Sequence, residues 1–406
     1  MSAGDPHTAD GGGSAGEVLV VFTRLGLTSF GGPIAHLGYF HDEFVVRRRW
    51  LDERRYADLV ALCQFLPGPA SSQVGIAVGH ARAGVLGALA AWLGFTLPSA
   101  IALVLFAWGV GTTADLADAG WLQGLKIVAV AVVAHALWGM ATKLTPDRPR
   151  ITLAVAAAVL ALAWPTSAGQ VTIILLGGLL GWRLFRGAPP STPRTDAGRA
   201  ASRRVGATLL VVFAVLLVAL PALREATGAF PVAVADSFYR AGSLVFGGGH
   251  VVLPLLQAEV VPPGWVDDET FIAGYGAAQA VPGPLFTFAA YLGAVAGPGA
   301  FGLGLAVVAL LAIFVPSFLL VLGVLPFWDR LRGVAPVQAA LMGVNAVVVG
   351  ILLAALYHPV WTSAIFAPSD FALALAAFLA LAIWKWPAWL VVVATALAAA
   401  GVGLVA

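Results

Sequence analysis

The residues best suited to chemistry in this chain lie where its helices have to stop. The stretch Gln64-Phe65-Leu66-Pro67-Gly68-Pro69 returns later as Gln279-Ala280-Val281-Pro282-Gly283-Pro284. Proline removes a backbone donor and clashes with the turn before it, and glycine accepts dihedrals that other residues avoid. Each copy therefore predicts a half-helix, a break and a second half-helix. Ser72 and Thr287 follow the two breaks, where a hydroxyl group suits the first turn of a new helix.

Helix breaks of this kind are suited to binding anions. Two glycine runs, Gly31-Gly32 and Gly247-Gly248-Gly249, predict two further breaks. The N-terminus of a half-helix offers free N–H donors and a partial positive charge, so several such ends could hold an oxyanion without a full counter-charge. Gln64 and Gln279 either donate amide hydrogen bonds to that anion or bind the carbonyl groups that the breaks leave free. The glycines also suit close packing of helices in lipid, and both roles stay open.

Three basic residues inside apolar segments are further candidates for binding the anion. Ionisable groups are energetically expensive in a membrane interior and are therefore functional candidates. Arg24 and Arg240 each precede a glycine break at the same spacing, and Lys126 begins an apolar stretch. The alternative is that they reach the membrane surface or pair locally. Asp236 stands four residues before Arg240 and would share its helix face.

Asp58 is a candidate for carrying a coupling proton. It lies on the predicted helix that leads to Pro67, although it also follows Arg54 and Arg55 at helical spacing and can pair with one of them instead. Four histidines show no metal-ligand spacing and are expected in packing or at interfaces: His36, His80, His135 and His250.

The sequence lacks the motifs of the common enzyme classes. Cys63 is its only cysteine, so neither an intrachain disulfide nor a cysteine-based metal site is expected. It contains no Walker-type phosphate loop and no Gly-x-Ser-x-Gly elbow. We therefore expect no catalytic residues, no cofactor and no resident metal, and we disfavour a membrane enzyme.

Composition shows what kind of element must position these residues. Of 406 residues, 60% are hydrophobic and only 10% are charged, compared with roughly 25% charged in an ordinary soluble domain. The chain is therefore predicted to be an all-α polytopic membrane protein whose main solvent is lipid. The formal net charge is only +2, so no nucleic-acid partner is expected.

The order of segments predicts two homologous halves. Residues 1–16 are small and polar, lack the apolar core of a signal peptide and are predicted to be a disordered tail. Residues 17–186 form a first repeat, with spans expected at 83–110, 121–142, 151–165 and 168–186. A linker rich in arginine and proline follows at 187–204. Residues 205–406 form a second repeat, which begins with an extra span at 205–223.

Internal similarity shows the duplication directly. The pattern Phe22-x-Arg24-x-Gly26-x-x-x-Phe30-Gly31-Gly32 returns 216 residues later as Phe238-x-Arg240-x-Gly242-x-x-x-Phe246-Gly247-Gly248. Trp50-x-Asp52-Glu53 likewise returns as Trp265-x-Asp267-Asp268. Two copies of one helical unit are therefore expected.

Charge indicates that the two copies are inserted in opposite directions. Residues 47–55 contain five arginines, whereas the matching second segment contains Glu259, Asp267, Asp268 and Glu269. By the positive-inside rule the first loop is cytoplasmic and the second is external. Inverted repeats with broken or re-entrant helices are a recurring plan of secondary transporters, with the site near the bilayer midplane where the repeats meet.

These ordered motifs resemble the chromate transporter family in its long form with two homologous halves. The resemblance covers nearly the whole chain beyond residue 16. It implies secondary active export of chromate from a bacterial cytoplasm across the plasma membrane, with coupling to the proton gradient. The second copy departs from the first at Gly249, where the first has Pro33, and at Ala273, where the first has Asp58. These departures leave open whether both halves bind substrate equally.

Several alternatives stay open at this point. A passive anion channel can use the same plan of broken helices. Sulfate resembles chromate in charge and shape, so the sequence does not choose between these oxyanions. A homodimer is compatible with the sequence and is not required by it.

Overall fold

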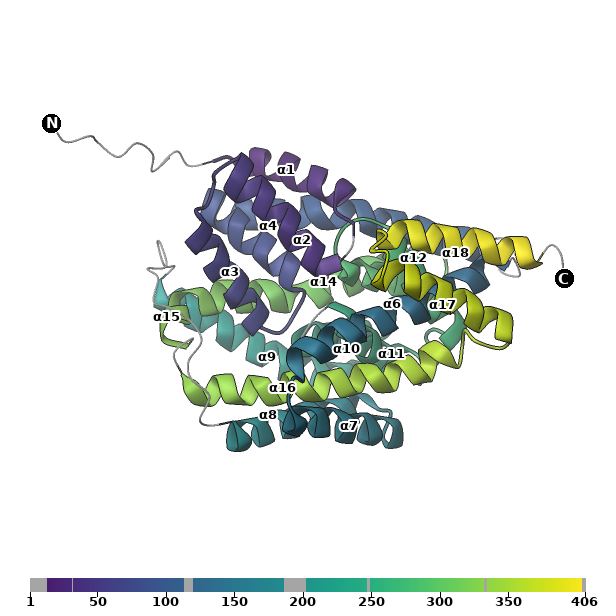
Figure 1. Cartoon of the computed structure of the whole chain (residues 1–406). Helices are drawn as coiled ribbons and strands as arrows, with labels where there is room; N and C mark the ends of the chain where they lie inside the picture. The colour runs from purple at the N-terminus through teal and green to yellow at the C-terminus, as the bar shows by residue number, and fades with distance from the viewer. Residues whose placement is uncertain are drawn as a thin grey trace.

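The chain is a bundle of helices. The computed structural model describes residues 13–30, 32–112, 120–185, 202–246, 249–331 and 334–403, and every regular element among them is helical (Figure 1). Helices long and apolar enough to cross a membrane cover Ala70–Gly109, Gly120–Leu144, Arg203–Thr227, Gly299–Phe327 and Ala335–Trp361. The prediction of an all-α, multi-pass membrane protein is therefore confirmed.

The two halves contain corresponding elements in the same order. The first half consists of α1 (Ala15–Thr28), α2 (Gly32–His41), η1 (Asp42–Arg47), α3 (Glu53–Phe65), α4 (Ala70–Thr112), α6 (Gly120–Leu144), α7 (Arg148–Ala163) and α8 (Ser167–Leu184). The extra span is α9 (Arg203–Thr227).

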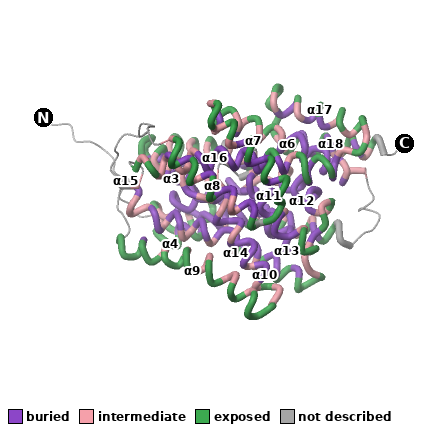
Figure 2. Tube along the Cα trace, turned by 90° about the horizontal axis from the view of Figure 1, so that it is seen from below, coloured by how far each residue is buried: buried purple, intermediate pink, exposed green. Residues whose placement is uncertain are grey.

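The second half consists of α10 (Phe230–Leu244), η2 (Gly249–Val251), α11 (Val252–Val260), α12 (Asp268–Ala280), η3 (Leu285–Thr287), α13 (Phe288–Val295), α14 (Gly299–Val324), η4 (Leu325–Phe327), α15 (Trp328–Leu331), α16 (Ala335–Ala355), η5 (Leu356–Trp361), α17 (Pro368–Ala382) and α18 (Ala388–Gly403). Most of α9 is exposed along the outside of the bundle (Figure 2).

The helices stop at all four predicted breaks. α1 ends before Gly32, α3 ends before Pro67, α10 ends before η2, and α12 ends before Pro282. Gly32, Gly68 and Gly283 have φ values of +79°, +124° and +98°, which side chains with a Cβ rarely adopt. Gly31, Gly247 and Gly248 lie outside the described residues.

A second interruption divides α4. Ala83 and Gly84 have non-helical dihedrals, and Gly84 has a φ of +63°. The guanidinium of Arg82, just before this point, lies over the Trp50 ring and 3.2 Å from Glu17. The first segment of α4 therefore returns to the end where α1 begins, and the predicted uncharged span follows it.

The repeated Trp-x-Asp motif builds the same local structure twice. The backbone N–H of Trp50 donates to the carbonyl of Phe44, and the backbone N–H of Trp265 donates to the carbonyl of Val260. Asp52 and Asp267 are the N-caps of α3 and α12, and each carboxylate accepts a backbone N–H at 2.8 Å. Such a cap contributes about 1 kcal/mol to helix stability.

The two halves exchange their last helices. α7 and α8 of the first half pack on α16 of the second, whereas α17 and α18 of the second half pack on α6 of the first (Figure 1). Glycines permit this close approach: a Cβ on Gly181 would lie 2.6 Å from the backbone of α16, and one on Gly124 would lie 2.6 Å from the backbone of α18. The predicted repeats are therefore interlaced and do not pack as separate bodies.

The hairpins of the two halves lie towards opposite ends of the molecule. α3 and α15 lie at one end, and α12 and α18 lie towards the other, in both Figure 1 and Figure 2.

α7 is shorter than a typical span, since 16 residues extend about 24 Å and a bilayer core is about 30 Å thick. The opposite insertion of the two halves stays a prediction.

Labelling of single cysteines tests the inverted insertion. Ala57 is exposed on α3, and Pro263 is exposed in the α11–α12 loop. In a Cys63→Ser background, an impermeant thiol reagent applied outside intact cells should modify Pro263→Cys and leave Ala57→Cys untouched until the cells are opened. Modification of both from the outside would contradict opposite insertion.

Candidate functional site

The proline-glycine breaks of the two halves are joined reciprocally. Gly68 N–H donates to Val245 O at 2.7 Å, and Gly283 N–H donates to Ser29 O at 3.0 Å. Ser29 and Val245 are equivalent residues, each directly before the Phe-Gly-Gly motif of its own half. Each half therefore satisfies a backbone group that the other half's break exposes, and all four breaks meet at one junction.

The glycines at this junction are required by their geometry. A Cβ on Gly68 would lie 2.5 Å from Gln73 Nε2 and 3.0 Å from Ser317 Oγ, and one on Gly283 would lie 2.9 Å from Ser99 Oγ. The expectation that these N–H groups are free to close on an anion is not met in this structure, because backbone carbonyls already accept from both. Close packing between halves is the role that the contacts show.

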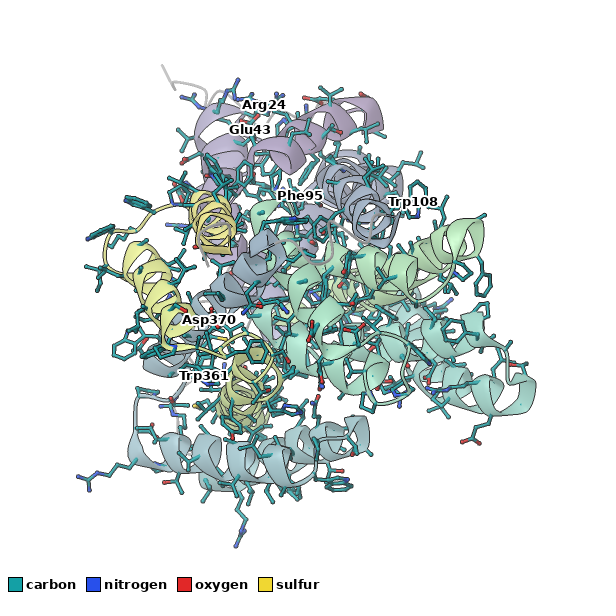
Figure 3. All side chains as sticks on the ribbon, turned by 90° about the vertical axis from the view of Figure 1, so that its right-hand side faces the viewer. Arg24, Glu43, Phe95, Trp108, Trp361 and Asp370 are labelled. Atoms are coloured by element: carbon teal, nitrogen blue, oxygen red, sulfur yellow. The ribbon has the colours of Figure 1, made fainter. Side chains whose placement is uncertain are left out.

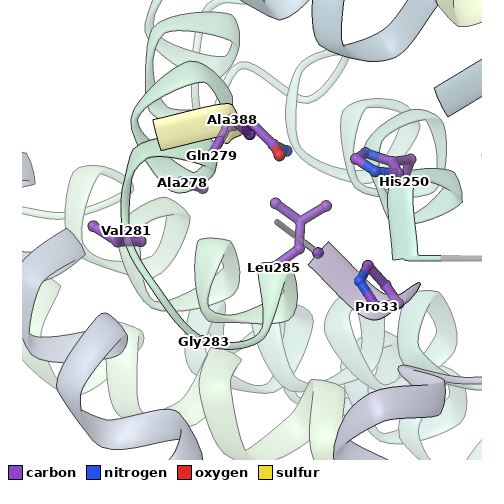
Figure 4. Close-up of a pocket in the computed structure, with 9 residues that line it drawn as sticks. Pro33, His250, Ala278, Gln279, Val281, Gly283, Leu285 and Ala388 are labelled. Atoms are coloured by element: carbon purple, nitrogen blue, oxygen red, sulfur yellow. The ribbon is translucent and has the colours of Figure 1, made fainter. Parts of the chain in front are cut away.

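A cavity opens beside this junction. Its empty volume is about 330 Å³, which includes space open to the solvent. Residues of both halves line it: Gly32, Pro33, His250, Ala278, Gln279, Val281, Gly283, Leu285 and Ala388 (Figure 4). Of the predicted site residues, the structure brings Gly32, Gln279 and Gly283 together here.

Two side chains give the cavity its chemistry. The Nε2 atom of Gln279 is buried and has no hydrogen-bond partner among the described residues, and Figure 4 shows the amide directed towards His250. His250 Nδ1 lies 2.8 Å from the hydroxyl of the buried Tyr275. The Tyr275 O–H can donate to Nδ1, which leaves the hydrogen of the neutral ring on Nε2. An amide NH₂ and an imidazole N–H are thus available to an acceptor.

The cavity also receives the start of a helix. Gly32 and Pro33 form the first residues of α2, so the positive end of its backbone dipole lies at the cavity wall. The lining contains no lysine, arginine or carboxylate side chain. The arrangement therefore offers neutral donors and partial positive charge, which suits an anion that must also leave again.

The two predicted glutamines have different environments. Gln64 is exposed on α3, whereas Gln279 faces the cavity. The freed carbonyl of Pro67 is bound by Gln73 Nε2 at 2.7 Å. The expected role of binding break carbonyls thus falls to a residue that sequence reasoning did not select.

The hydroxyls and prolines after the breaks are mainly buried. Thr287 Oγ1 donates to Pro284 O at 2.8 Å and closes its own turn. Ser72 is buried and its Oγ has no partner among the described residues. Pro69 and Pro284 are buried, and Pro67 and Pro282 are partly exposed.

Arg24 and Arg240 do not reach the cavity. Arg240 pairs with Asp236, and its Nε lies 3.5 Å from Glu259. Asp236 also lies 3.3 Å from Arg224 of the extra span. The local pairing left open by the sequence is therefore present in the second half.

The first half contains a looser version of the same pair. Arg24 is exposed on α1 and lies near Glu43 (Figure 3), the residue equivalent to Glu259. Burial acts to raise the pKa of Glu43, but Arg48, Arg47 and Arg24 outweigh it and hold that pKa below its usual value. Arg24 and Arg240 thus each lie near a carboxylate of their own half, Glu43 in η1 and Glu259 in α11, and offset its negative charge.

The remaining predicted residues lie elsewhere. Lys126 is buried on α6, with its Nζ 3.3 Å from Glu269 of α12. Asp58 is partly exposed on α3. His250 is the functional candidate that sequence reasoning missed. Its only signal was its position two residues after Gly248, on the element that follows a break.

Comparisons with known proteins agree with this architecture. Residues 16–182 and 232–402 each match the family described as "Chromate transporter". The chain is 27% identical over 361 residues to the chromate transport protein of Cupriavidus metallidurans, covering 87% of this chain and 84% of that protein. It is 30% identical over 358 residues to the chromate transport protein of Pseudomonas aeruginosa, covering 83% and 79%.

A third similar protein is the probable chromate transport protein of Synechococcus elongatus, 29% identical over 321 residues, with 77% of this chain and 76% of that protein covered. No solved structure is significantly similar to the chain.

Alanine at the junction glycines should destabilise the protein. Gly68→Ala and Gly283→Ala each force a Cβ into a positive φ and into the facing half, which should lower the free energy of unfolding by about 1–3 kcal/mol. Gly304→Ala is the matched control, because a Cβ there meets nothing within 4 Å in α14 and should be neutral or stabilise by up to about 1 kcal/mol. Melting temperatures of the purified variants decide between these outcomes. Unchanged melting of both junction variants would contradict the packing role.

The two equivalent arginines should differ in their effect on stability. Arg240→Gln leaves the buried carboxylates of Asp236 and Glu259 short of a partner, while Arg24→Gln removes an exposed side chain. A buried pair broken on one side costs about 3–5 kcal/mol. The Arg240 side chain is 27% exposed, so we expect about 1–3 kcal/mol for it and a few tenths for Arg24. Thermal unfolding measures both losses. Equal losses in the two variants would contradict the predicted difference between the two arginines.

Proposed function

The chain belongs to the chromate transporter family, and from that premise we propose that it is a secondary active exporter of chromate that draws on the proton gradient. The observation that carries this proposal is the cavity at the junction of the breaks. It is built from both halves, and it contains an amide NH₂ for which the described part of the chain offers no partner.

The donors suit a tetrahedral dianion. Buried hydrogen-bond donors without partners destabilise a protein by about 1–3 kcal/mol each, so an acceptor that enters the cavity removes this penalty. Gln279, His250 and the start of α2 supply donors from different directions around a small volume. Because none of them carries a fixed full charge, the anion is held without being trapped.

The junction also provides a route to alternating access. The reciprocal bonds from Gly68 to Val245 and from Gly283 to Ser29 are each a single backbone contact between hairpins of the two halves. Because the terminal helices of the two halves are interlaced, the moving parts are the hairpins. Rocking of α1–α3 against α10–α12 would break or re-form both bonds together and would open the cavity to one side at a time. We propose that residues 17–186 and 205–406 are inverted repeats that move in this way, joined by a cytoplasmic linker at 187–204.

Charge supports entry from the cytoplasm. Arg49, Arg54 and Arg55 are exposed at the end where the first-half hairpins begin. Clustered positive charge raises the local concentration of a dianion and steers it to the protein. We place that end on the cytoplasmic side of a bacterial plasma membrane, so the proposed direction of transport is export.

Transport by the purified protein in sealed liposomes tests the proposal. An imposed proton gradient or membrane potential should drive chromate to accumulate against its own gradient, and protein-free liposomes should show none. Flux that only ever runs downhill would replace the exporter by a passive anion channel. Competition by sulfate in the same assay measures whether the site distinguishes the two oxyanions.

The two equivalent glutamines provide a matched test of the site. Gln279→Leu keeps the side-chain size but removes the unpartnered donor, so chromate affinity should fall about 10- to 100-fold, the range for hydrogen bonds to charged groups. Gln64→Leu changes the exposed counterpart and should leave affinity unchanged. Chromate binding to both purified variants is the measurement. Equal affinities in the two variants would exclude the cavity as the binding site.

A further inference from the structure

His36 is a fully buried histidine whose two ring nitrogens are both hydrogen-bonded. Its exposed fraction is 0%. Nε2 lies 3.2 Å from Ser29 O, and Nδ1 lies 3.3 Å from Ser71 Oγ. A carbonyl oxygen can only accept, so Nε2 carries the hydrogen of the neutral ring and Nδ1 accepts the Ser71 hydroxyl.

The ring connects the two breaks of the first half to the cavity. Ser29 caps the end of α1, and Ser71 lies in the first turn of α4. Ser29 O also accepts the N–H of Gly283, which lines the cavity. His36 itself stands one helical turn after Gly32 and Pro33, which line the cavity from α2.

The surroundings of the ring contain no compensating charge within hydrogen-bond distance. The Phe95 ring packs edge-on against it at 5.2 Å. The ring's hydrogen bonds go to Ser29 and Ser71, and none of the titratable groups on the neighbouring described elements makes one. Those groups are Glu17 and Arg24 on α1, Tyr39 and His41 on α2, Asp42, Glu43 and Arg47 on η1, Glu53, Arg54, Arg55, Tyr56, Asp58 and Cys63 on α3, and His80 and Arg82 on α4; His250 faces the cavity from η2.

We propose that His36 takes up one proton when an oxyanion occupies the cavity, an inference that rests on the proposed function. A lone imidazolium in this apolar setting is unfavourable, and a dianion in the cavity, which Gly32 and Pro33 line one turn earlier on α2, supplies the missing negative charge. Linkage is reciprocal, so the proton must in turn strengthen binding of the anion. A proton carried outward with the anion moves against an inward pH gradient. The inside-negative membrane potential, acting on the net negative cargo, is therefore the part of the proton-motive force that favours export.

The hydrogen bonds of His36 accommodate the extra proton. In the imidazolium form Nε2–H still donates to Ser29 O, and the new Nδ1–H donates to Ser71 Oγ. The Ser71 hydroxyl then turns to another acceptor, as helix serines do towards the carbonyl one turn before. Ser29 Oγ and Ser72 Oγ, in the residues beside these contacts, are buried and have no partner within the described part of the chain, so either is free to take part in that rearrangement.

His250 is less suited to this role. Its Nδ1 partner, the hydroxyl of Tyr275, is fixed on a fully buried ring and would lose Nδ1 as its acceptor if Nδ1 became protonated. The second half has no counterpart of the His36 pair either, because Val252 and Phe286 occupy the equivalent positions. The structure therefore assigns one proton site to each chain.

Chromate binding to the purified full-length protein tests the inference. Above about pH 7.5 chromate is the dianion, and if its binding takes up one proton, chromate affinity should fall by up to about tenfold for each unit that the pH rises. A pH indicator in weak buffer should also record proton uptake when chromate is added to wild type. His36→Gln should bind chromate with little pH dependence and without proton uptake, and His80→Gln, outside the cavity, should behave as wild type.

Ser71→Ala keeps the test decisive if His36→Gln folds poorly. It removes the acceptor of the new Nδ1–H, so proton uptake should fall while chromate still binds. Wild-type binding without proton uptake, or uptake that persists in both variants, overturns the inference and leaves the proposed function standing. Absence of chromate binding to wild type at every pH overturns the proposed function itself.

Discussion

The structure depends on how backbone groups freed by helix breaks are satisfied in an interior without water. A helix that stops midway leaves N–H and C=O groups that lipid cannot bind, and each unpaired group destabilises the fold by several kcal/mol. Here the Gly68 N–H reaches Val245 O and the Gly283 N–H reaches Ser29 O, so each half supplies what the other lacks. In one copy alone these breaks would leave backbone groups unpaired, whereas in two copies they form the contact between the halves. The cavity lies beside that contact.

Much of this arrangement could be predicted from the chain itself. Proline and glycine have local backbone effects, so Pro67-Gly68-Pro69 and Pro282-Gly283-Pro284 predict breaks without tertiary information. The repeated motifs likewise predict two equivalent sets of hairpins. The partners across the junction could not be predicted, because the bond from Gly68 to Val245 depends on how hairpins far apart in sequence are packed. The Pro67 carbonyl is bound locally by Gln73, in the first turn of the helix after the break, and not by Gln64 before it.

Duplication has left the halves alike in backbone and different in chemistry. His36 and Ser71 of the first half correspond to Val252 and Phe286 of the second, while Gln279 lines the cavity and its counterpart Gln64 is exposed. The first half thus contributes the start of α2 and a titratable ring, and the second contributes the amide donor and His250. Sequence equivalence therefore did not predict functional equivalence: matched positions share a backbone role, and their side chains have diverged into separate tasks.

The exchange of terminal helices has a consequence for the history and cooperativity of the molecule. Because α7 and α8 cover α16 while α17 and α18 cover α6, neither half can bury its own long helix alone. A single-copy ancestor with this packing would have been an obligate dimer, in which the terminal helices of each subunit packed on the long helix of the other. Fusion then needed only a connecting segment and one additional crossing, which α9 supplies on the periphery without entering the core. The present chain is, in this sense, a dimer whose subunits can no longer dissociate.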